Sequence, residues 1–238
     1  KLHPLPEPIP AGDWISQLPD TCELNKNLQR WHGRLSTTDI GAFRQDYANH
    51  LQLLDAQIQQ LLAALAKRDD ARQTAIAVTS DHGEMLGDHN MLYKGTFLEA
   101  SIRVPFQYCP PPSLNNQPKA LRRPVGLTNM FSTMLSNLVN GGQAKEIVQT
   151  AKKTDYVCVE FGDELLVIQN SRKLCRQLSG EILWATHLGQ DPQEQLNQLK
   201  NNPKLLKQNK GWTRISEISE KELQKRRDQH WKLLNFKT

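Results

Sequence analysis

The sequence predicts an α/β fold, in which helices flank a sheet, followed by a smaller antiparallel sheet near the C-terminus. Three observations lead to this class. A long apolar stripe with helical spacing precedes a β-branched run at 74–80, and a second helical pattern follows at 127–139. Four short apolar runs, separated by turn residues, then occupy 155–185. We therefore expect helix, strand, strand and helix, followed by the antiparallel sheet.

The first long helix is predicted to begin at one of the N-cap candidates in 36–39 and to reach about Leu65. Residues 1 to about 35 are rich in proline and are expected to be irregular. Ser, Thr and Asp at 36–39 are favoured N-cap residues. Apolar residues then recur three and four apart, at Phe43, Tyr47, Leu51, Leu54, Ile58, Leu61, Leu62 and Leu65. Such a stripe predicts a helix that packs against another part of the protein.

Two strands are predicted around a glycine-containing loop. TAIAVTS, at 74–80, has the length and β-branched content of a buried strand. Asp81 therefore follows the carboxyl end of a strand, where open α/β sheets place ligand-binding residues. The loop passes through Gly83 and Gly87 and leads to IRVPFQYC at 102–109, a second predicted strand that runs into prolines.

The remaining elements divide the chain into two predicted domains, 1–150 and 151–238. LTNMFSTMLSNLV at 127–139 predicts a helix closed by Asn140, Gly141 and Gly142. The polar stretch near 143–154 is the expected boundary. Beyond it, DYVCVEF, ELLVIQ, RKLCRQL and EILWA alternate with turn residues, which is typical of a small antiparallel sheet.

Composition and charge exclude several classes of protein. With 38% hydrophobic and 23% charged residues, the chain of 238 residues is an ordinary globular one. No apolar run is long enough for a membrane span. Residues 200–238 carry eleven Lys or Arg and four Asp or Glu, which we interpret as a helix with a solvated, charged face, since no nucleic-acid motif accompanies them.

The ends of the chain and its cysteines carry little functional information. The N-terminal residues KLHPLPEPIPAGDW lack the pattern of a signal peptide, and the chain does not begin with Met, so its compartment stays open. The four cysteines, Cys22, Cys109, Cys158 and Cys175, form no CxxC pair. We expect reduced, buried thiols rather than a zinc or redox site.

TSDHGEMLGDHNMLYKG, at 79–95, contains the candidate site residues. Adjacent Asp81 and His82 can offer a carboxylate oxygen and an imidazole nitrogen to one cation, and this chemistry suits calcium, magnesium or manganese. Two ligands do not complete a coordination sphere, so the others must come from elsewhere. Lys94 could bring an ammonium group to an anionic substrate. Without further signals, Asp81 and His82 are as typical of a hydrogen-bonded structural turn, and Lys94 of a solvated surface lysine.

Several segments resemble the sulfatase family in order and spacing. TSDHGEMLGDHNMLYKGTFLEASIRVPF, at 79–106, is similar to the family signature that joins S-D-H-G-E and G-D-H to a lysine and to E-x-S-x-R-V-P. YANHLQLLDAQIQQLLAAL, at 47–65, resembles the helix before that signature, and PVGLTNMFSTML, at 124–135, the helix after it. Residues 164–203 resemble the family's C-terminal subdomain.

The resemblance implies a fold of the alkaline-phosphatase superfamily, with a partial central sheet in this chain. It implies Asp81 and His82 as ligands of a divalent cation, generally calcium, and Lys94 as a contact to the sulfate of a small-molecule or carbohydrate ester. A formylglycine supplies the nucleophile in this family. His82 in place of asparagine is typical of a branch that includes choline-sulfatase-like and phosphonate-monoester-hydrolase-like proteins.

The sequence also departs from the family pattern. The motif C/S-x-P-S/A-R, which carries the formylglycine, is absent and is expected upstream of this chain. Cys109-Pro110-Pro111-Pro112-Ser113 lacks the arginine and is interpreted as the loop that ends a strand. His3 is left unassigned. Asp88 and His89 are expected to brace the loop, and Glu99 and Arg103 to pair along a helical turn.

Three functions therefore remain open. The first is the C-terminal part of a sulfatase, inactive alone. The second is a phosphonate or phosphodiester hydrolase of the same superfamily. The third is a non-catalytic, sulfatase-derived binding protein. The sequence does not indicate the oligomeric state.

Overall fold

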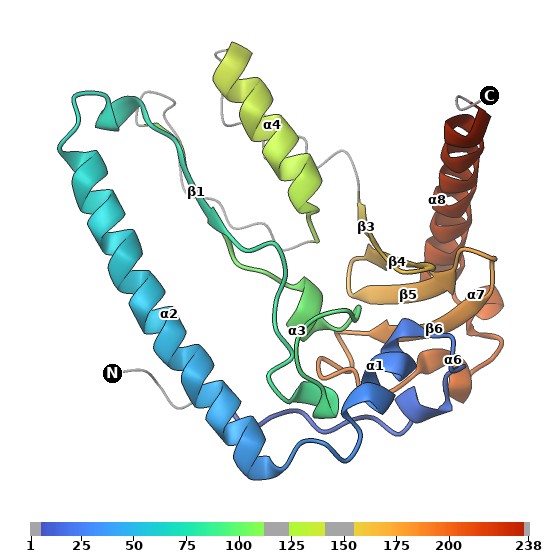
Figure 1. Ribbon diagram of the computed structural model, residues 1–238. Helices are drawn as coiled ribbons and strands as arrows, with labels where there is room; N and C mark the ends of the chain where they lie inside the picture. The colour runs from blue at the N-terminus through green and yellow to red at the C-terminus, as the bar shows by residue number, and fades with distance from the viewer. Residues whose placement is uncertain (1–5, 112–123, 141–154, 236–238) are drawn as a thin grey trace.

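The computed structural model describes residues 6–111, 124–140 and 155–235 (Figure 1). The helices are η1 (Ile15–Gln17), α1 (Glu23–Trp31), α2 (Thr37–Ala66), η2 (Ala71–Gln73), η3 (Asp88–Asn90), α3 (Glu99–Ile102), α4 (Leu127–Asn140), α6 (Gln198–Asn201), α7 (Leu205–Gln208) and α8 (Lys210–Asn235). The strands are β1 (Ile76–Thr79), β2 (Phe106–Cys109), β3 (Tyr156–Phe161), β4 (Glu164–Gln169), β5 (Arg172–Gln177) and β6 (Ile182–His187). This order confirms the predicted α/β class with its small antiparallel sheet.

The first sheet is an antiparallel ribbon of β1 and β2, in which Ile76 pairs with Cys109 and Thr79 with Phe106. The run at 74–80 was predicted to be a buried strand, but β1 is only partly buried because few described side chains pack on the ribbon. The second strand begins at Phe106, four residues later than predicted. The residues before it form α3 and a short connection that ends at Pro105. Proline has no backbone N–H to donate to a neighbouring strand.

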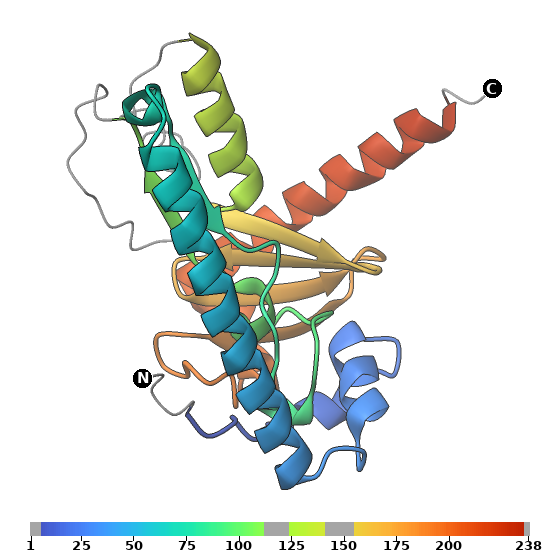
Figure 2. The ribbon, with the colours of Figure 1, turned by 60° about the vertical axis from the view of Figure 1, so that its left-hand side comes forward.

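Helix α2 begins as predicted, but most of its apolar stripe is exposed. Ser36 and Asp39 form a capping box, in which each side chain accepts a backbone N–H of the other residue. Only Ile40 and Ala48 of the helix are buried. Figure 1 shows α2 running along one edge of the molecule, and Figure 2, in which this edge comes forward, shows the helix in front of the other elements. The prediction that the stripe packs against another part of the protein is therefore wrong for the described chain.

Helix α1 lies in the segment that the sequence analysis expected to be irregular. Its apolar residues Leu24, Leu28 and Trp31 have helical spacing and pack into the main core. Leu24 is fully buried, as is Cys22 just before the helix. This spacing was the signal for α1, but the neighbouring prolines and the shortness of the helix obscured it.

The main core joins three parts of the chain. Buried residues of the N-terminal segment, of the loop at 85–98 and of the antiparallel sheet form one cluster: Trp14, Ile15, Leu18, Cys22, Leu24, Met85, Met91, Phe97, Leu98, Leu166, Ile168, Cys175, Leu183 and Trp184. The rings of Trp14 and Trp184 lie 5.7 Å apart. The loop that follows β1 is therefore anchored on the sheet by its own buried side chains.

The four-stranded sheet has the order β3-β4-β5-β6, with each neighbouring pair antiparallel. Its other face is covered by α8, whose Trp212, Ile215 and Leu223 pack on residues of β4, β5 and β6. The domain boundary predicted near 143–154 lies outside the described residues, and so do Gly141 and Gly142, which were expected to close α4. Asn140, the remaining residue of that predicted helix end, is the last residue of α4.

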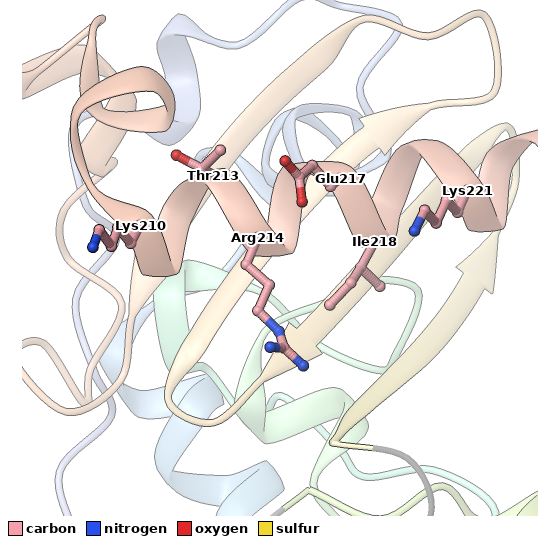
Figure 3. A pocket seen from close by; sticks show the side chains of 6 residues that line it. All are labelled: Lys210, Thr213, Arg214, Glu217, Ile218 and Lys221. Atoms are coloured by element: carbon pink, nitrogen blue, oxygen red, sulfur yellow. The ribbon is translucent and has the colours of Figure 1, made fainter.

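The outer face of α8 is charged, as predicted for the basic tail. Figure 3 shows an open, polar hollow along this helix, lined by Lys210, Thr213, Arg214, Glu217, Ile218 and Lys221. Arg214 pairs with Asp155 at 2.8 Å, and Arg226 pairs with Glu222 at 2.9 Å. Part of the positive charge is thus matched by nearby carboxylates. Among the helices described here, none is both long and apolar enough to cross a membrane.

Asp88 and His89 brace the loop, as predicted. The Asp88 carboxylate accepts the N–H of Ile9 at 2.9 Å, and the His89 N–H donates to the Ile9 carbonyl at 2.6 Å. His89 is 2% exposed. The pKa of His89 is lowered from 6.5 to about 4. Burial is the main cause; the charge of Asp191 opposes it, and the charge of Lys173 adds to it.

The exposed stripe of α2 predicts that the 238-residue chain binds a hydrophobic dye and self-associates. Replacing Leu54 and Leu61 by glutamine should reduce both, without lowering the urea midpoint, because these side chains are 49% and 68% exposed. Dye fluorescence, sedimentation and urea unfolding measure the three quantities. A monomer that unfolds cooperatively and binds little dye would contradict the prediction.

His89 predicts a loss of stability in acid. Its folded pKa of about 4 lies below the ordinary value of 6.5, so the unfolded chain binds the proton more readily. The stabilisation is complete above pH 6.5 and is lost as the pH falls towards 4, by about 3 kcal/mol. His89→Asn, which suits the positive φ of 53° at this position, should flatten the pH dependence of unfolding in urea. Exposed His50→Asn is the control, and equal slopes in all three proteins would refute the assignment.

Candidate functional site

Asp81 and His82 form a tight turn directly after β1. The Asp81 Oδ1 accepts the backbone N–H of His82 at 3.0 Å, and its Oδ2 lies 3.4 Å from His82 Nε2. The hydroxyl of Ser80 donates to the His82 carbonyl at 2.7 Å. The His82 N–H holds the pKa of Asp81 below its usual value, with smaller contributions from the charges of His82 and Lys94. At neutral pH this exposed side chain is therefore a carboxylate.

The hydrogen bond of His82 fixes which ring nitrogen is free. Its Nδ1 lies 2.8 Å from the carbonyl oxygen of Gly83. A carbonyl can only accept, so Nδ1 carries the hydrogen, and in the neutral ring Nε2 keeps its lone pair. Metal-binding histidines commonly bond a carbonyl in this way through their other nitrogen. A carboxylate oxygen and a free imidazole nitrogen thus converge, and this donor pair fits a divalent cation.

Gly83 is required by the close approach of α3. A Cβ at this position would lie 2.0 Å from the carbonyl oxygen of Ala100. The Gly83 N–H also donates to the Ser101 carbonyl at 2.7 Å. Any side chain would push the turn away from α3, so the glycine of the Asp-His-Gly stretch fixes the direction of the two candidate ligands.

The described residues do not supply a complete set of metal ligands. In residues 6–111, 124–140 and 155–235, no three His, Cys, Asp or Glu side chains gather in a geometry that could hold a metal ion. Asp81 and His82 can therefore hold only part of the coordination sphere of a cation.

Lys94 is exposed, and α1 holds its backbone in place. The side-chain amide of Asn27 donates to the carbonyl oxygens of Lys94 and Gly95, both at 3.1 Å. The charge of Lys94 makes the smallest contribution to the lowered pKa of Asp81. Sequence reasoning missed Asn27, because it lies in the segment expected to be irregular. A polar residue buried on an otherwise apolar helix face was the available signal.

The segment around Lys94 has an unusual backbone. Tyr93 and Gly95 have φ angles of 64° and 95°, in the left-handed region. The N–H of Met85 donates to the Tyr93 carbonyl at 2.9 Å, and the ring of Tyr93 lies 5.6 Å from that of Trp31. Buried residues on either side therefore hold the lysine in a defined loop.

A buried ion cluster ties this loop to the antiparallel sheet. The Lys173 Nζ lies 2.6 Å from Glu194 Oε1 and 3.2 Å from Glu99 Oε1. The N–H of Glu99 donates to Glu194 Oε2 at 2.7 Å. The predicted pairing of Glu99 with Arg103 is wrong, because α3 ends at Ile102 and Arg103 already has an extended backbone.

None of the cysteines resembles a nucleophile at this site. Cys109 is exposed, contrary to the expectation of a buried thiol, and pairs with Ile76 at the end of the ribbon remote from Asp81. Burial raises the pKa of Cys22 and of Cys158 to about 12, and that of Cys175 well above its usual value. These three thiols remain protonated at neutral pH.

Comparison with known proteins gives a consistent result. The family model described as Sulfatase matches residues 16–139. An arylsulfatase of Clostridium perfringens is 28% identical over 219 residues, which cover 87% of this chain and 43% of that protein. The chain therefore spans less than half the length of this relative.

Solved structures show the same fold. BT1596, a 2-O GAG sulfatase, matches with a TM-score of 0.70 and 18% identity over 97% of this chain and 55% of its own. The phosphonate monoester hydrolase SpPMH of Silicibacter pomeroyi matches with a TM-score of 0.71 and 18% identity over 94% of this chain and 50% of its own. Because the Sulfatase model covers more than half of the residues, the chain belongs to the sulfatase family.

Proposed function

We propose that this chain provides one side of the active site of an enzyme that hydrolyses sulfate esters. The observation that carries the proposal is the convergence of Asp81 Oδ2 and His82 Nε2, which lie 3.4 Å apart in the turn after β1. Family membership supports the same reaction class. A divalent cation, most suitably calcium, would bind Asp81 and His82 together with ligands from outside the described residues.

Each residue of the site has a definite role in this proposal. Asp81 and His82 hold the cation, which supplies positive charge to the sulfate oxygens when it is bound. Lys94 binds another sulfate oxygen and stabilises the negative charge that develops there. Asn27 positions the backbone of Lys94. The formylglycine motif does not occur in this chain, so the nucleophile of the proposed reaction is not among its residues.

Hydrolysis of phosphonate or phosphate esters is the second candidate. The likeness to the phosphonate monoester hydrolase SpPMH favours it, since both structures share a fold. Sulfate and phosphonate groups are both tetrahedral anions, so the cation and the lysine could bind either. Comparing kcat/KM for an aryl sulfate and an aryl phosphonate, in an active protein that contains this chain, decides between them. A non-catalytic binding protein would turn over neither.

The carbohydrate class of substrate has separate support. BT1596 is a GAG sulfatase, and the present chain shares its fold over nearly all of its length. We propose a sulfated carbohydrate as the substrate in preference to a simple aryl ester.

Variants of the three site residues should separate cation binding from turnover. Asp81→Ala removes an anionic ligand and should lower the bound cation strongly, and His82→Ala should do so less, since it removes a neutral donor. Lys94→Ala should leave the cation bound and lower turnover by roughly a hundredfold. Metal content and sulfate-ester hydrolysis, in an active protein that contains this chain, measure both effects. Lys67→Ala, at the end of α2, is the control. Full metal occupancy in Asp81→Ala, or a normal rate in Lys94→Ala, would show that the role assigned to that residue is wrong.

The chain by itself should have no measurable activity. We expect the rate of aryl sulfate hydrolysis to equal that of a protein-free control at any calcium concentration, because the motif that supplies the formylglycine nucleophile does not occur in this sequence. The assay compares the purified chain with Cys109→Ala. Turnover that persists through purification and disappears in Cys109→Ala would identify Cys109 as a nucleophile and contradict the prediction.

A further inference from the structure

Two large aromatic side chains are exposed beside Lys94. Tyr93 is 59% exposed, and Phe161, at the end of β3, is 44% exposed. The Phe161 ring lies against Gly95, since a Cβ there would be 3.2 Å from Phe161 Cζ. Lys94 therefore lies between two aromatic residues that come from distant parts of the chain.

One side of α1 sets the order of these residues. Glu23 packs on Gly162, next to Phe161, because a Cβ at Gly162 would be 2.9 Å from Glu23 Oε1. Asn27, one turn later, bonds the backbone of Lys94 and Gly95. Trp31, one turn later again, packs on Tyr93. Phe161 and Tyr93 are thus held on either side of the Lys94 backbone by contacts along α1.

The arrangement is costly for a surface that serves only stability. Tyr93 has a φ of 64°, which is unfavourable for a bulky residue, and its ring faces water. Strained residues of this kind cluster at binding sites. Two buried atoms of α1, Asn27 Oδ1 and Trp31 Nε1, also have no hydrogen-bond partner within the described residues. Because both atoms are buried, an internal water molecule would satisfy them.

These features match the chemistry of a sugar ring. A pyranose has an apolar face of C–H groups, which packs on aromatic rings, and a rim of hydroxyls, which bond to polar groups. We propose that Tyr93 and Phe161 form a carbohydrate subsite, in which they hold the sugar rings of a sulfated glycan while Lys94 binds its sulfate. The assignment of the sulfate rests on the proposed function, and the aromatic contacts extend it to the sugar.

Binding to the whole 238-residue chain tests the subsite without any need for turnover. The probes are inorganic sulfate, a glycosaminoglycan disaccharide with one 2-O sulfate, and the same disaccharide without sulfate, each titrated calorimetrically in calcium. Tyr93→Ala and Phe161→Ala should each weaken the sulfated disaccharide roughly tenfold and leave inorganic sulfate unchanged. Tyr93→Phe should keep the affinity, because it keeps the ring. Phe131→Ala is the matched control, since Phe131 on α4 is 45% exposed and remote in sequence from the loop.

The outcomes separate the two proposals. If Tyr93→Ala and Phe161→Ala bind the sulfated disaccharide as tightly as the parent chain, the subsite is overturned. It is also overturned if either variant loses inorganic sulfate equally, or if Tyr93→Ala only reduces self-association, which would identify a protein contact. If the aromatic variants lose affinity for the disaccharide while Lys94→Ala keeps its affinity for inorganic sulfate, the sugar subsite stands. The role of Lys94 in the proposed function then fails. Urea midpoints equal to that of the parent chain confirm that each variant is folded.

Discussion

A buried ion cluster of Lys173, Glu194 and Glu99 ties the start of α3 to the antiparallel sheet. Lys173 is fully buried on β5, and Glu194 lies in the turn after β6. Charged side chains buried away from water are stable only when each is paired with an opposite charge, and removal of one leaves the other without its counter-charge. Glu99 completes the cluster through its carboxylate and its backbone N–H, so the start of α3 cannot leave the sheet without breaking these bonds. Lys94 lies only five residues before Glu99.

The candidate site therefore combines a local turn with distant support. The geometry of Asp81 and His82 depends on neighbouring residues, chiefly the carbonyl of Gly83 and the contact of that glycine with α3. Lys94 depends on residues far away in the sequence, because Asn27 holds its backbone from one side and the ion cluster fixes the chain beyond it. Changes in the antiparallel sheet are thus coupled to the loop of the lysine through packed elements, among them Phe161 of β3, which lies against Gly95.

What the sequence could predict follows the same division. Features set by adjacent residues were predicted well: β4 coincides with the run at 164–169, the capping box lies within 36–39, and Asp81 directly follows a strand. Features set by tertiary contacts were not. The burial of β1 and α2 depends on what packs against them, and α1, a short helix, is stabilised by the core it joins rather than by its own propensity. Asn27 could be recognised only once that helix was in place.

The exposed apolar residues of α2, the strand β1 and the candidate cation ligands lie on one side of the molecule. Both faces of the antiparallel sheet are covered by packed side chains, whereas the stripe of α2 and the strand β1 are largely exposed in the described chain. The candidate cation ligands Asp81 and His82 lie on the same side, because Asp81 is the second residue after the end of β1. A single polypeptide surface packed along β1 and α2 could cover the apolar residues and bring further carboxylates to Asp81. Stability and metal binding would then depend on the same contact, so cation affinity should rise as the hydrophobic face is buried.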